Sequence, residues 1–170
     1  GTVVIGEGER DEAPMLYIGE NVGIGGPQVD IALDPLEGTT ITAKGGENAM
    51  AVIALAQEGG FLNAPDVYMK KISTNTNNEK VVSLDQDLKS NIKDLAKFKK
   101  INIEDLLICI LDRERHKHEI EIIRSTGARI KMIDDGDVSA VISSVLISSS
   151  IDMYYGIGGA PEGVLAAAAL

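Results

Sequence analysis

Aromatic residues and cysteine are scarce in this sequence. It has no tryptophan, one cysteine and an aromatic content of 4% among 170 residues, so its core must be mainly aliphatic. Cys109 cannot form an internal disulfide, and its place in the apolar run 106–111 predicts a buried structural thiol, consistent with a reducing compartment. No apolar run reaches the length of a membrane span, and no signal-peptide pattern opens the chain. We therefore expect a cytoplasmic protein without membrane contacts.

Basic residues are also in the minority. The 16 lysines and arginines against 26 aspartates and glutamates give a net charge of −10, which argues against a nucleic-acid or anionic-membrane partner. An acidic protein that binds phosphates needs cations as intermediaries. With 44% hydrophobic and 25% charged residues the chain is globular, and its length suits one domain with a sizeable core.

The apolar segments predict an α/β fold. Strand-like runs alternate with helical patterns, which favours a mixed sheet in residues 1–100 followed by a parallel βαβαβα unit in residues 101–170. The expected strands are 2–5, 29–33, 107–111, 128–133 and 151–157, and the expected helices are 13–20, 84–97, 114–125, 138–147 and 161–170. Residues 49–63 are interpreted as a hairpin, with a short helix as the alternative, and residues 70–80 as an exposed loop.

Both ends of the sequence look cut. Residues 1–5 already have a strand pattern, and residues 164–170 form a strong helix pattern without a cap or stop signal. We expect a partial domain that belongs to a longer protein and is truncated at both ends.

The stretch 34–39, with the sequence DPLEGT, follows a buried strand and carries two carboxylates. Pro35 cannot continue a sheet ladder, so the chain must turn, and Asp34 and Glu37 can converge with a backbone carbonyl between them. Mg²⁺ is usually held by one or two carboxylates together with substrate phosphate, and Thr39 adds a hydroxyl that can orient a water. The alternative is a capped turn at the end of a strand.

The other candidate residues also follow expected strands. They are Glu7, the pair Arg113 and Arg115, the pair Asp135 and Asp137, and the glycine-rich stretch 156–163 with Glu162. Because ligands of α/β sheets gather outside the carboxyl ends of the strands, we expect one shared site.

Each of these candidates has a simpler alternative. Glu7 suits a metal-binding loop or a solvated acidic turn. The arginine pair suits bidentate phosphate binding or a solvated helix start, and the pair at 135 and 137 suits acceptors of sugar hydroxyls or a helix cap. Tyr68 is a candidate contact or a half-buried surface aromatic, and Glu9, Asp11 and Glu12 suit the start of a helix.

Two further patterns exclude other functions. His116 and His118 do not share a helical face, and hard cations do not choose imidazole, so neither is expected to bind a metal. The glycines of 156–163 favour an anion at a helix start, but Pro161 breaks the dinucleotide-binding pattern and no P-loop is present. Glu162 makes better sense there as a ligand to a cation.

The stretch 34–39 resembles the D-P-x-D/E-G-T signature of the lithium-sensitive, metal-dependent sugar-phosphate and inositol-phosphate phosphatases. From residue 3 to residue 170 the chain resembles the class II fructose-1,6-bisphosphatases, whose cyanobacterial members also act on sedoheptulose 1,7-bisphosphate. The resemblance rests on residues 4–20, 34–39, 63–69, 133–138 and 155–164, and residues 70–100 carry little of it. It implies a layered sugar-phosphatase fold.

By position, the resemblance implies that Glu7, Asp34, Glu37 and Glu162 bind Mg²⁺ or Mn²⁺, and that Asp34, Glu37 and Thr39 are catalytic. It implies substrate contacts by Glu37, Gly38, Thr39, Tyr68, Arg113, Arg115, Asp135, Asp137 and Gly159. Glu114 stands where some members have proline and is not expected to touch phosphate. One metal-binding aspartate of the family lies upstream of residue 2, and the C-terminal half of the family is absent, so the fragment is expected to bind metal weakly and to be inactive alone.

The implied reaction is hydrolysis of the 1-phosphate of fructose 1,6-bisphosphate, in gluconeogenesis or the Calvin cycle. A homo-oligomer, dimer or tetramer, is expected in the cytoplasm, or in a plastid if the source is a photosynthetic eukaryote. The alternatives are a related inositol or nucleotide phosphatase, an inactive paralogue that binds metal or sugar phosphate, and a nucleotide-binding α/β domain.

Overall fold

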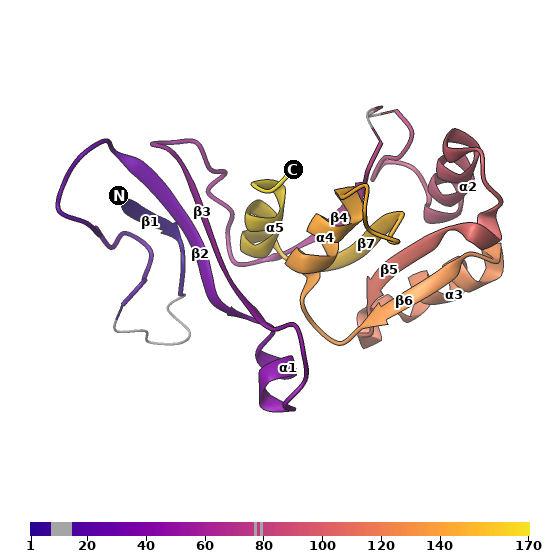
Figure 1. Cartoon of the computed structure of the whole chain (residues 1–170), viewed down its shortest axis with the longest axis horizontal. Coiled ribbons are helices and arrows are strands. Elements are labelled where there is room, and N and C mark those ends of the chain that lie inside the picture. The colour runs from indigo at the N-terminus through magenta and orange to yellow at the C-terminus, as the bar shows by residue number, and fades with distance from the viewer. Residues whose placement is uncertain (8–14, 77, 79) are drawn as a thin grey trace. The chain divides into compact units, whose positions relative to one another are not determined.

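A computed structural model of the chain describes residues 1–7, 15–76, 78 and 80–170. The chain forms two compact units, the first from Gly1–Val67 together with Gly159–Leu170 and the second from Tyr68–Gly158 (Figure 1). Each unit contains one sheet with helices packed on it, which confirms the predicted α/β class.

The first unit is built on a sheet of three strands in the order β1-β2-β3 (Figure 1). These strands are β1 (Thr2–Ile5), β2 (Val29–Glu37) and β3 (Met50–Gln57); β1 is parallel to β2, and β2 is antiparallel to β3. Helix α5 (Ala160–Ala167) contacts β2 and β3 and buries Val164 and Leu165 against Ile5 and Ala32. The sheet and α5 therefore share one aliphatic core.

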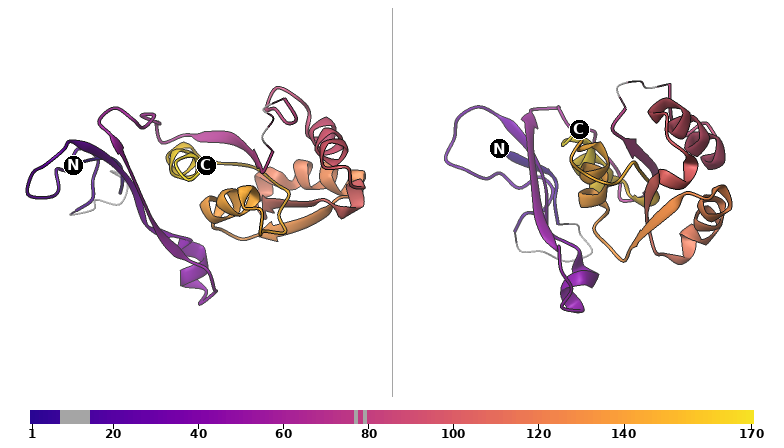
Figure 2. Two further views of the ribbon diagram at one scale, coloured as in Figure 1. Left: turned by 45° about the horizontal axis from the view of Figure 1, so that its top comes forward. Right: turned by 45° about the vertical axis from the view of Figure 1, so that its right-hand side comes forward.

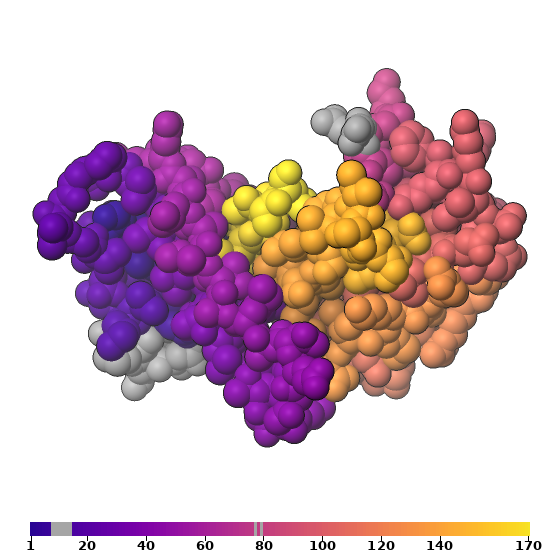
Figure 3. Space-filling model, in the orientation of Figure 1, coloured from indigo at the N-terminus to yellow at the C-terminus, as the bar shows by residue number. Residues whose placement is uncertain are grey.

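A short helix, α1 (Thr39–Ala43), follows β2 and has no buried residue. It protrudes from the end of the strand as the purple lobe at the bottom of Figure 3. Gly38 precedes this helix with φ 101°, in the left-handed region that favours glycine.

Three expectations for the first unit are wrong. Strand β2 does not stop at residue 33 but runs to Glu37, with a register shift between Asp34 and Glu37 that accommodates Pro35. Strand β3 exists, but it pairs with β2 and not with residues 61–63. Residues 15–20 are not helical: Leu16 has φ 63°, and their backbone bonds to β1 instead. Residues 13–14 of that expected helix, and Glu9, Asp11 and Glu12, lie outside the described residues.

The second unit has a four-stranded sheet in the order β4-β7-β5-β6. The strands are β4 (Tyr68–Thr74), β5 (Leu107–Leu111), β6 (Arg129–Ile133) and β7 (Met153–Gly159). Strand β5 is parallel to both β6 and β7, which confirms the parallel layer predicted for residues 101–170.

Helices cover both faces of this second sheet (Figures 1 and 2). Helix α2 (Leu88–Lys99) and helix α3 (Lys117–Thr126) contact each other and bury Ile92 and Ile123 in the same core as Ile108 and Ile110. Helix α4 (Asp137–Val145) contacts β4 and β5. Because side chains alternate along a strand, the neighbours of the first core residues, including Tyr154, face the α4 side.

Short 3₁₀ turns, η2 (Ile103–Asp105) and η3 (Glu114–His116), connect these elements. The interpretation of residues 70–80 as an exposed loop is wrong for residues 70–74, which belong to β4 and bury Lys71 and Ser73. In the part of the chain that the structure describes, no helix combines the length and apolar character needed to cross a membrane.

Candidate functional site

The residues predicted to form the site belong to different units. The first unit holds Glu7, Asp34, Glu37, Gly38, Thr39, Gly159 and Glu162, and the second holds Tyr68, Arg113, Arg115, Asp135 and Asp137. The first group carries carboxylates suited to cations, and the second carries the basic side chains suited to phosphate.

Three of the acidic residues lie two positions along the chain from members of one core cluster in the first unit. Ile5 and Ala32 are partners across the parallel strands β1 and β2, and both lie in a core cluster with Val164 of α5. Glu7 and Asp34 follow these two partners by two residues each, and Glu162 precedes Val164 by two residues. The shared core thus fixes the backbone positions from which the three carboxylates project.

The stretch 34–39 combines a closed turn with a buried acid. The Asp34 carboxylate accepts a hydrogen bond of 2.9 Å from the Leu36 backbone N–H at its Oδ1 atom, which stabilises the bulge in β2. Glu37 is 4% exposed, so its side chain is buried at the end of β2. A Cβ atom at Gly38 would lie 3.2 Å from Cδ1 of Ile41, so both space and φ favour glycine.

The start of α5 brings Gly159 and Glu162 together. Pro161 occupies the first turn of the helix, where its missing N–H costs nothing. The Glu162 side chain turns back toward the helix start, and a Cβ atom at Gly159 would lie 3.1 Å from its Cδ atom. Glycine at 159 leaves room for that carboxylate.

The donor atoms of the first unit have the right chemistry for a hard divalent cation, since Mg²⁺ and Mn²⁺ prefer oxygen ligands. Within residues 1–7, 15–76, 78 and 80–170, no three His, Cys, Asp or Glu side chains are grouped closely enough to hold a metal ion. The carboxylate oxygens of the described candidate ligands are therefore not gathered around one point.

In the second unit, the parallel strands bring two predicted site residues to one edge of the sheet. Arg113 follows β5 and Asp135 follows β6, and their side chains form an ion pair of 4.0 Å. Both side chains are partly exposed, at 36% and 24%, so the pair is accessible to a ligand. Both residues follow strands as the sequence indicated, and their part in a ligand site stays a prediction.

Arg115 is held by two contacts. Its Nε atom donates a hydrogen bond of 2.8 Å to the carbonyl oxygen of Ile157 in β7. Its guanidinium carbon lies 4.8 Å from the centroid of the Tyr68 ring, a cation–π arrangement. Tyr68 and Arg115, which no sequence pattern connects, are therefore neighbours.

His116 is completely buried, and its Nε2 atom accepts a hydrogen bond of 2.8 Å from the backbone N–H of Ile157. Burial, followed by the positive charge of Arg115, lowers the pKa of this imidazole below its ordinary value. The ring is therefore neutral at neutral pH, with its proton on Nδ1. This position agrees with the expectation that His116 is not a metal ligand.

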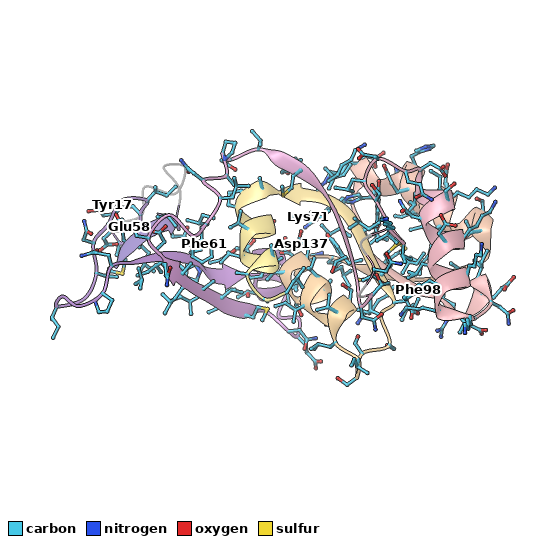
Figure 4. All side chains as sticks on the ribbon, turned by 90° about the horizontal axis from the view of Figure 1, so that it is seen from above. Tyr17, Glu58, Phe61, Lys71, Phe98 and Asp137 are labelled. Atoms are coloured by element: carbon cyan, nitrogen blue, oxygen red, sulfur yellow. The ribbon has the colours of Figure 1, made fainter. Side chains whose placement is uncertain are left out.

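Asp137 is deeply buried and paired within the unit. Its Oδ2 atom lies 2.6 Å from Nζ of Lys71 and 3.3 Å from the hydroxyl of Tyr154, and the two charged side chains are 7% and 5% exposed. Figure 4 shows Lys71 on β4 directed toward the start of α4, where Asp137 lies. Neither partner was identified from the sequence, because Lys71 lies in a polar stretch and is 66 residues away from Asp137.

Two units, each with helices packed on one sheet, place the chain in the class of layered α/β proteins. The family model for bacterial fructose-1,6-bisphosphatase, glpX-encoded, matches residues 1–170, so the chain belongs to this family.

Curated relatives support the same assignment. The chain is 50% identical over 171 residues to a protein of Synechococcus sp. (strain RCC307) and 46% identical over 183 residues to one of Gloeobacter violaceus, each named D-fructose 1,6-bisphosphatase class 2/sedoheptulose 1,7-bisphosphatase. These alignments cover 100% of this chain and 51% and 53% of the relatives. The chain thus spans about half the length of the curated relatives that it matches.

Proposed function

We propose that the full-length protein hydrolyses the 1-phosphate of fructose 1,6-bisphosphate, and that it also accepts sedoheptulose 1,7-bisphosphate. The observation that supports the proposal is the match of the family model for bacterial fructose-1,6-bisphosphatase to residues 1–170. The names of the curated relatives support the choice of substrates.

Metal binding is part of the proposal. Glu7, Asp34, Glu37 and Glu162 would hold Mg²⁺ or Mn²⁺, which supplies charge neutralisation for the phosphoryl oxygens. Thr39 would orient the attacking water from the start of α1. Phosphoryl transfer depends mainly on positioning and charge neutralisation, so carboxylates and one hydroxyl suffice as the protein's contribution on this side.

Substrate binding would use the second group of residues. Arg113 and Arg115 would bind the distal phosphate, since guanidinium groups form bidentate hydrogen bonds with phosphate oxygens. Further contacts to the sugar phosphate would come from Gly38, Tyr68, Asp135, Asp137 and Gly159. We also propose that the protein acts as a homo-oligomer, dimer or tetramer, in the cytoplasm.

Phosphate release by the full-length protein, measured with and without Mn²⁺, tests this function. Glu37→Gln keeps the volume of the side chain but removes its charge, and we expect a loss of activity of about 100-fold or more. Glu58→Gln, at an exposed glutamate in the turn after β3, is the matched control. A Glu37→Gln protein that keeps the wild-type rate would contradict the assignment.

A substrate panel separates the rival functions. An inositol phosphate or a nucleotide 3′-phosphate that is hydrolysed faster than either sugar bisphosphate would favour the related phosphatases. Metal binding by the intact protein without turnover of any of these substrates would favour a binding protein without catalytic activity.

A further inference from the structure

The backbone of Ile157 in β7 is bound on both sides by consecutive residues of the segment that carries the arginines. Its N–H donates to Nε2 of His116 at 2.8 Å, and its carbonyl oxygen accepts from Nε of Arg115 at 2.8 Å. The side chains of two consecutive residues therefore hold the two peptide groups that flank Ile157.

The turn η3 brings these groups into place. The backbone N–H of His116 donates to the carbonyl oxygen of Arg113 at 2.8 Å, which closes the turn over Glu114. Arg113 and Arg115 thereby lie on a segment whose C-terminal end is hydrogen-bonded to β7. The Arg113 side chain extends from this segment to Asp135 beyond β6.

The two hydrogen bonds to Ile157 differ in their exposure to water. Arg115 is exposed, and a guanidinium hydrogen bond to a carbonyl at the surface competes with solvent. His116 is 0% exposed and its bond to Ile157 is partly buried, so solvent competes less with this bond. Loss of the buried acceptor would also leave the Ile157 N–H unsatisfied, which is unfavourable.

We propose that His116 is a positioning residue for phosphate binding: its Nε2 acceptor fixes the backbone of Ile157 at the N–H, and the carbonyl oxygen of the same residue in turn fixes the guanidinium of Arg115 beside Tyr68. The proposal rests on the proposed function in one respect, namely that Arg113 and Arg115 bind a phosphate group of the substrate. His116 itself touches neither the substrate nor a metal.

The test compares three variants of the full-length protein. His116→Leu has a similar volume but no acceptor, His116→Gln restores an acceptor, and His118→Leu makes the same change at an exposed histidine two residues away. Kinetics with fructose 1,6-bisphosphate give KM and kcat separately, and calorimetric titration with inorganic phosphate gives Kd independently of turnover.

We expect His116→Leu to raise KM and the phosphate Kd about tenfold, the effect of one lost hydrogen bond, with kcat within about twofold of wild type. His116→Gln should recover most of this loss, and His118→Leu should match wild type. A purely structural role would lower thermal stability and leave KM unchanged, so a wild-type KM in His116→Leu overturns the proposal.

The two proposals fail in different ways. If the wild-type protein releases no phosphate from either sugar bisphosphate, the proposed function is wrong, and the titration with inorganic phosphate still decides the role of His116. Wild-type Kd in His116→Leu, or no phosphate binding by the wild-type protein, overturns the inference. If His116→Leu does not fold, His116→Asn, whose shorter side chain cannot reach Ile157, is compared with His116→Gln, and equal KM values overturn the inference.

Discussion

Lys71→Met should strongly destabilise the second unit. The substitution keeps most of the side-chain volume but removes the cation 2.6 Å from Asp137, at a site where the two side chains are 7% and 5% exposed. Breaking a buried ion pair by removing one partner costs about 3–5 kcal/mol, because the remaining charge is left uncompensated. The Tyr154 hydroxyl, 3.3 Å from the same oxygen, continues to stabilise the carboxylate. We therefore expect a loss near the lower limit, about 3 kcal/mol.

Urea unfolding of the full-length protein, followed by far-ultraviolet circular dichroism, measures this loss. With a slope of about 2 kcal/mol per molar urea, the midpoint should fall by about 1.5 M. Lys70→Met is the control, because Lys70 is the exposed neighbour on the same strand. The double variant Lys71→Met with Asp137→Asn should recover part of the loss, since it removes the uncompensated charge. Equal midpoints for Lys71→Met and Lys70→Met would refute the reasoning.

Two further predictions concern buried titratable groups. Burial lowers the pKa of His116 below its ordinary value of 6.5, so the neutral ring stabilises the fold above pH 6.5 and this contribution is lost as the pH falls through the lowered pKa. In His116→Gln the decline of thermal stability toward acid pH should therefore be shallower. An unchanged decline would assign it to other groups. Burial raises the pKa of the Cys109 thiol to about 11, so a thiol reagent at pH 8 should label the unfolded protein and not the folded one, and rapid labelling of the folded protein would contradict the buried position.

The second half of the fold was predictable because its signals are local and repeated. The apolar run 106–111 is bounded by charged residues and contains β5, and the helical periodicity before and after it places α2 and α3 within a few residues. Parallel pairing followed from the alternation of strands and helices, because parallel neighbours need a crossover connection.

The first half was less predictable because tertiary contacts override local patterns there. Residues 15–20 have helical spacing of apolar side chains, but the N–H of Val3 donates to the carbonyl of Glu20 and the N–H of Gly19 donates to the carbonyl of Val3. These bonds with β1 replace helical ones. Pro35 was interpreted as the end of a strand, although a bulge lets the strand continue past a residue that cannot donate to the ladder.

The positions of the candidate residues after strands could be read from the sequence, but their partners within the protein could not. Asp137 is engaged by Lys71, and Arg115 by Ile157 and Tyr68, through partners that come from other strands. Side chains already held in place lose little conformational freedom when a ligand binds, so anchoring them favours affinity. The second unit therefore presents fixed polar groups. In the first unit, where no three candidate metal ligands of the described residues are grouped, the binding energy of a cation would have to gather their oxygens.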